Sequence, residues 1–187
     1  MRILMTHVQT TLNKWPKESK EAAQLVIDAY GEPEEVCGST MTWHKAGSWK
    51  RIIAYKDFDK HDFPAPHIDC VETFIDYKVP EEKVSELNVF DGSVVVNRTR
   101  GEISARCHDV QANSLALNLA HDVIHGKKTA QEARAYYAHE FLGYRKKEPT
   151  PYIDKLLFKP GEPGGDPDKR LLSDNQLEVA INQGSKK

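Results

Sequence analysis

The sequence predicts an α+β domain with an antiparallel sheet of four to five strands, covered on one side by an N-terminal helix and a C-terminal helical hairpin. Three patterns predict it: the apolar spacing of an amphipathic helix near the N-terminus, two stretches that alternate as β-hairpins do, and two consecutive helical stretches after them. A chain of 187 residues has the length of one domain. We expect that domain to span residues 1–144, and a polar, Pro/Gly-rich tail to span residues 145–187.

The first helix is predicted from Pro16 to Tyr30. Pro16 suits a first helical turn, where its missing N–H would have no partner anyway, and Gly31 can end the helix. The apolar residues fall on one stripe of this helix, so one face is expected to pack on the sheet. They are Ala22, Leu25, Val26, Ala29 and Tyr30.

The first hairpin is predicted to pair residues 35–44 with 49–56 across a four-residue turn. In the register that we expect, Met41, Trp43, Ile52 and Ala54 share the core face, whereas Trp49 lies on the polar face. An indole exposed on that face would indicate a contact surface.

Residues 57–69 are predicted to be a long loop, because Pro64 and Pro66 prevent regular strand pairing. A strand over 70–79 and a short helix over 80–89 follow. A second hairpin is predicted to pair 93–99 with 102–107. Its apolar face is expected to contain Val94, Val96, Ile103, Ala105 and Cys107.

Two helices are predicted to close the domain, from 109 to 125 and from 129 to 142. Thr129 and Glu132 have the spacing of a capping box, which marks the start of the second helix. The short connection between the helices predicts that they pack antiparallel. Within the tail, residues 171–181 could form one further short helix.

Composition argues against several classes of protein. The formal net charge is −2 and no basic stripe is present, so we expect no nucleic-acid partner. No stretch approaches the roughly 18 apolar residues of a membrane span, and the N-terminus lacks the pattern of a signal peptide, so the cytoplasm is the expected location. The three cysteines are far apart and form no metal-binding knuckle. Phosphate-binding glycine loops and serine-hydrolase motifs are absent too.

The leading candidate site combines the 57–69 stretch with the polar face of the sheet. The stretch is rich in histidine and aspartate, which suit a divalent transition metal, and arginines on the sheet face suit a small anion. A solvated loop and a solvated sheet face are the alternative interpretation. The predicted ligand-binding residues are His44, Arg51, His61, His67, Asp69 and Arg106.

A second candidate is His121 with His125. Histidines four residues apart lie on one face of a helix, one turn apart, as two imidazole ligands of a metal ion do. A full metalloprotease motif is missing, because Asp122 follows the first histidine where that motif has glutamate. The alternative is a polar helix face with His125 near the C-terminal dipole.

Cys107-His108 resembles a nucleophile with its base only in sequence. Neighbouring residues on a strand point to opposite faces, so His108 is not expected to activate Cys107. The predicted register also places Cys107 on the apolar face, where a thiolate is disfavoured. We therefore expect a structural cysteine.

The sequence leaves three functions open. The first is a domain that binds a small anionic ligand or a divalent metal ion at the 57–69 stretch and the polar sheet face. The second is a metal-dependent enzyme that uses His121 and His125. The third is a non-catalytic subunit of a homo- or hetero-oligomer held by the tail at 145–187.

Overall fold

The computed structural model describes residues 7–162 and 166–185 and has a six-stranded antiparallel sheet with the order β1-β2-β3-β4-β6-β5. The α+β class with an antiparallel sheet is therefore confirmed, with six strands instead of four to five. The strands are β1 (Glu35–Val36), β2 (Thr40–His44), β3 (Arg51–His61), β4 (His67–Asp76), β5 (Val94–Asn97) and β6 (Glu102–Cys107).

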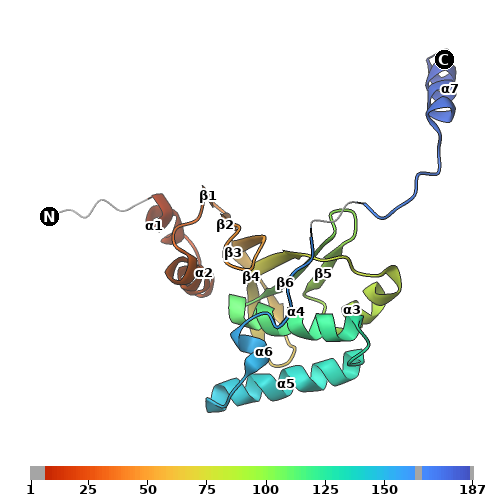
Figure 1. Cartoon of the computed structure of the whole chain (residues 1–187). Coiled ribbons are helices and arrows are strands. Elements are labelled where there is room, and N and C mark those ends of the chain that lie inside the picture. Colours follow the sequence, from red (N-terminus) through yellow and green to blue (C-terminus); the bar gives the residue numbers. More distant parts are fainter. Residues whose placement is uncertain (1–6, 163–165, 186–187) are drawn as a thin grey trace.

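Helices pack on the sheet and then on one another (Figure 1). Helix α2 contacts β3 and β4, α4 contacts β4, β5 and β6, and α5 packs against α4. The helices are α1 (His7–Leu12), α2 (Lys17–Tyr30), α3 (Val84–Phe90), α4 (Val110–Ile124), α5 (Ala130–Lys146), α6 (Pro151–Asp154) and α7 (Asp174–Gly184), with a 3-10 turn η1 (Glu81–Lys83) before α3. Helix α1 has no counterpart among the predicted elements.

The core faces of both predicted hairpins are confirmed, but the pairing differs from the predicted one by two residues: His44 lies opposite Arg51, not opposite Trp49. Met41 lies opposite Ala54 and Trp43 opposite Ile52, and all four side chains are buried. In the second hairpin, Val94 lies opposite Ala105 and not opposite Cys107, where the predicted turn at residues 100–101 would have placed it. A shift of two residues leaves every side chain on its predicted face. Trp49 contradicts the prediction: it is only 5% exposed, and its indole N–H donates to the hydroxyl of Tyr30 on α2.

The prediction of a long loop at 57–69 is wrong. Strand β3 continues to His61 and β4 begins at His67, with Lys60 opposite Ile68 and His61 opposite His67. The prolines exclude pairing only at the tip, residues 62–66, where a missing N–H removes no ladder bond. A register shift between Ala54 and Asp59 separates this distal part of the hairpin from its base.

The chain after α5 first follows the domain and then leaves it. Ile153 of α6 is buried, and Asn118 of α4 hydrogen-bonds to Tyr152, Lys155 and Leu157. Helix α7 has no buried residue and stands away from the sheet at the C-terminal end (Figure 1). Among the described helices, none combines the length and the apolar character of a membrane span.

Candidate functional site

Three potential metal ligands meet at the far end of the β3–β4 hairpin. His61 and His67 lie opposite each other in the strand ladder, and Asp69 follows on β4. One ligand atom from each lies within 4.8 Å of the other two. Within the part of the chain that the structure describes, no other group of three His, Cys, Asp or Glu side chains is this compact.

Asp69 is the centre of this group and is only 2% exposed. Its Oδ2 accepts a short hydrogen bond from Ser93 Oγ and lies 3.2 Å from His61 Nδ1. Its Oδ1 lies 3.1 Å from His67 Nε2, but the contact does not have hydrogen-bond geometry, and Oδ1 has no hydrogen-bond partner among the described residues. Because a buried carboxylate oxygen is costly to leave unsatisfied, this position favours a cation.

The ring of His67 is oriented by the backbone of the hairpin tip. Its Nδ1 lies 2.8 Å from the carbonyl oxygen of Ala65, which can only accept, so Nδ1 carries a hydrogen. The other nitrogen, Nε2, then faces Asp69 and lies 3.3 Å from the sulfur of Cys107. The Asp69 carboxylate, helped by Cys107, raises the pKa of His67 to about 11, so this place favours a positive charge.

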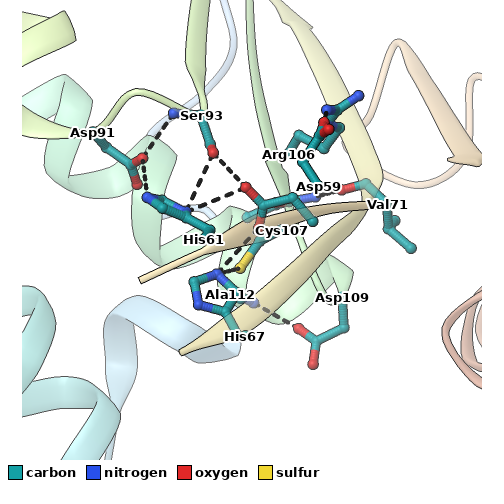
Figure 2. A network of polar contacts seen from close by, with 12 residues as sticks. Asp59, His61, His67, Val71, Asp91, Ser93, Arg106, Cys107, Asp109 and Ala112 are labelled. Atoms are coloured by element: carbon teal, nitrogen blue, oxygen red, sulfur yellow. Dashed lines mark hydrogen bonds and ion pairs between the residues drawn. The ribbon is translucent and has the colours of Figure 1, made fainter. Parts of the chain in front are cut away.

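His61 lies between two further polar residues. Its Nδ1 is 3.4 Å from Ser93 Oγ, and its Nε2 is 4.0 Å from Asp91 Oδ1 (Figure 2). Asp91 is 3% exposed, and burial raises the pKa of its carboxyl group. Both residues come from the turn between α3 and β5, and no sequence motif connects them to His61.

Cys107 is a buried residue of the apolar face, as predicted, and its neighbour is His67, not His108. Burial raises the pKa of the Cys107 thiol, which disfavours a nucleophile. A catalytic triad needs the acid on the imidazole nitrogen opposite the nucleophile. Here Asp69 and Cys107 both face the same nitrogen of His67. Cys70 is inert as well, because burial raises its pKa to about 12.

The structure does not bring His44 and Arg51 to this group. They lie opposite each other at the start of β3, whereas His61 ends it, about 33 Å away at 3.3 Å per residue. His44 contacts Glu35 at 2.6 Å. Arg106 lies closer, since it pairs with Asp59 and lines a hollow with His61 and Asp69.

Acidic partners already neutralise the predicted anion-binding face. Glu102 forms ion pairs with Arg51 at 3.0 Å and with Lys50 at 2.7 Å. Glu72 accepts hydrogen bonds from the hydroxyls of Tyr55 and Ser104. Burial opposes ionisation of Glu102, but the two cations outweigh it and lower the pKa of its carboxyl group. An anion would have to displace these carboxylates.

The rings of His121 and His125 lie against each other on α4, tilted by 37°, with their centroids 4.1 Å apart. His121 Nδ1 lies 2.8 Å from the hydroxyl of Tyr77, and its ring stacks on Phe158. Burial, followed by the charge of His125, lowers the pKa of His121. No third ligand of the His, Cys, Asp or Glu type joins them within the described ranges.

Two hollows flank the group at the hairpin tip. One of about 410 Å³ is polar and contains His61, Asp69, Ser93 and Arg106 in its wall. The other, of about 310 Å³, contains His67 and Cys107 in its wall. A ligand could therefore approach the group from either side.

Two imidazoles and one carboxylate form a ligand set that leaves coordination positions open, as in catalytic zinc sites and in non-haem iron sites. Ligand atoms about 2.0–2.1 Å from a tetrahedral metal lie roughly 3.3 Å apart. The contact of 3.1 Å between Asp69 Oδ1 and His67 Nε2 is close to this spacing, whereas the contact of 3.2 Å to His61 is made by the other carboxylate oxygen, Oδ2. The chain matches no protein-family model, and no curated protein and no solved structure matches it either.

Proposed function

We propose that the protein binds a divalent transition-metal ion through His61, His67 and Asp69, and that this ion binds the protein's ligand at its open positions. One observation carries the proposal: the buried Oδ1 of Asp69 has no hydrogen-bond partner among the described residues and lies 3.1 Å from an imidazole nitrogen. A carboxylate oxygen so placed needs a positive charge beside it.

The surrounding groups support a metal better than a proton alone. Metal-binding histidines usually donate their second N–H to a carbonyl or a carboxylate. His67 donates to Ala65 O, and Asp91 lies beside the second nitrogen of His61. Ser93 holds the remaining oxygen of Asp69. Each ligand side chain therefore has a group that orients it.

The competing interpretation is an ion pair between Asp69 and a protonated His67, with no metal. Elemental analysis of the purified protein, followed by calorimetric titration of the metal-stripped protein with Zn²⁺, Co²⁺ and Mn²⁺, separates the two. We expect one ion per chain. At a metal concentration one hundred times the Kd, binding would raise the free energy of unfolding by about 2.7 kcal/mol.

Variants locate the ion. We expect His61→Ala and Asp69→Asn to abolish saturable binding. His121→Ala and His125→Ala should keep it, because this pair on α4 lacks a nearby third ligand among the described residues. Loss of binding in the α4 variants alone would move the site to that helix. A metal-free protein that titrates no ion would leave the ion pair as the better interpretation.

A further inference from the structure

The cavity of about 310 Å³ lies between the hairpin tip, α4 and α5. Most of its wall is apolar or aromatic, and its polar residues include His67 of β4 and Cys107 of β6. A volume near 300 Å³ with a largely apolar wall is typical of small-molecule sites. The apolar and aromatic residues are Pro64, Pro66, Ala112, Leu115, Tyr137, Phe141, Tyr144 and Ile153.

Helix α5 gives the cavity two different ends. Tyr137 lies at the inner end, where its hydroxyl is 4.0 Å from the sulfur of Cys107. Arg145 follows two turns later on the same helix, about 12 Å along its axis at 1.5 Å per residue. Phe141 lies between them on this wall, and the guanidinium of Arg145 sits 5.0 Å from its ring centroid.

The charged side chains at the two ends of the cavity differ in whether they already have a partner. Arg145 is exposed, and no carboxylate in the described part of the chain forms an ion pair with it. Asp109, two residues after Cys107, lies at the inner end. Its carboxylate accepts a hydrogen bond from the backbone N–H of Ala112 at the start of α4 (Figure 2). The cation at the inner end, His67, already faces the carboxylate of Asp69, and Asp109 adds a negative charge there. An anionic group is therefore favoured near Arg145, whose guanidinium can bind a carboxylate with two hydrogen bonds.

We propose that this cavity binds a small carboxylic acid with an aliphatic or aromatic body. The carboxylate pairs with Arg145, the body lies along Phe141 and Tyr137, and the far end reaches His67 and Cys107. Binding itself depends only on the cavity and Arg145. That the far end meets a metal ion rests on the function proposed above.

Octanoate and its neutral analogue octanamide test the proposal by calorimetry with the full-length protein. We expect octanoate to bind saturably and more tightly than octanamide. Arg145→Gln should weaken octanoate binding about tenfold or more, because a charged hydrogen bond is lost, and should leave octanamide unchanged. Lys146→Gln is the matched control, since Lys146 is the next cation on α5 and does not line the cavity. Ala112→Phe, which fills the cavity, should abolish binding of both ligands.

Several results would overturn the proposal: no saturable octanoate binding, equal affinity for acid and amide, or equal effects of Arg145→Gln and Lys146→Gln. Octanoate could also coordinate the metal itself. In that case chelator or His61→Ala would abolish binding and Arg145→Gln would not, which also overturns the proposal. Arg145-dependent binding in metal-free protein supports it even if no metal ever binds, whereas metal binding without octanoate binding refutes this proposal alone.

Discussion

Asp69 is the residue around which the hairpin tip is arranged. It places a nearly buried negative charge between two imidazoles, and each carboxylate oxygen faces one of them. Removing a buried charge's partners costs several kcal/mol, so single changes here act on stability as well as on binding. Each variant of this group therefore needs a control that separates the effect on stability from the effect on binding.

The charge of His67 makes the metal-free protein sensitive to alkaline pH. Its pKa rises from 6.5 to about 11 on folding, so the folded state holds the proton more tightly than the unfolded chain. This contribution is complete below pH 6.5 and is lost as the pH rises through 11. We predict that the free energy of unfolding, measured with urea in the presence of chelator, falls over this range.

His67→Gln removes the titrating group and should flatten that fall. His125→Gln, which changes an exposed histidine of α4, should keep the wild-type profile. Parallel profiles for the wild-type protein and His67→Gln would contradict the assignment.

Asp91 is predicted to support the metal through His61. Because its carboxylate lies 4.0 Å from His61 Nε2, Asp91→Asn should weaken metal binding by about 10–100-fold. Calorimetric titration measures the change. Asp57→Asn, an exposed carboxylate of the same hairpin, is the control and should bind metal as the wild-type protein does.

At the scale of elements, the β3–β4 hairpin carries the three metal ligands and lines the cavity together with α4 and α5. Phe63 of the hairpin tip packs on Tyr137 of α5, with ring centroids 5.1 Å apart, and Arg134 of α5 lies over the ring of Phe63. Arg134 also donates to the carbonyl oxygen of Phe90, directly before Asp91. Helix α5 therefore connects the hairpin tip with the turn that carries Asp91 and Ser93.

The capping box of α5 should contribute measurably to stability. Thr129→Ala removes the acceptor of the Glu132 N–H and should lower the free energy of unfolding by about 1 kcal/mol in urea denaturation. Helix α7 has the same kind of box at Ser173 but no buried residue. Ser173→Ala should therefore leave global unfolding unchanged, and an equal loss in both variants would show that α7 packs on the domain.

Sequence patterns predict the elements whose faces are strictly periodic and miss those set by contacts far along the chain. The faces of both hairpins follow from alternation alone, and the α5 start follows from Thr129 and Glu132. The prediction of a loop over 57–69 is wrong because Pro64 and Pro66 exclude strand pairing only at the tip of the hairpin. Asp91 joins the site only through the strand order β4-β6-β5, which no local pattern encodes.

At the scale of the whole molecule, the chain after α5 consists of a bound part and an outer part. Deleting residues 148–187 removes buried Ile153 and the partners of Asn118, so we predict a loss of about 3 kcal/mol or more. Deleting residues 171–187 should leave the free energy of unfolding unchanged, because α7 buries nothing. Urea denaturation compares the two truncations.

The shorter truncation also tests the proposal that the tail holds an oligomer. Leu177 and Ile181 lie four residues apart on α7 and are both exposed, as a helix that packs on a partner would leave them in a single chain. If α7 binds a second copy, removing residues 171–187 lowers the mass measured by light scattering while the fold stays intact. An unchanged mass refutes this role.

His61, His67 and Asp69 belong to a single hairpin, and their meeting depends on His61 standing opposite His67. A strand slipped by one residue would send alternate side chains to the wrong side and could not chelate an ion. An ion captured early by the nascent hairpin would select the native pairing, so metal supplied during refolding should speed folding as well as stabilise its product.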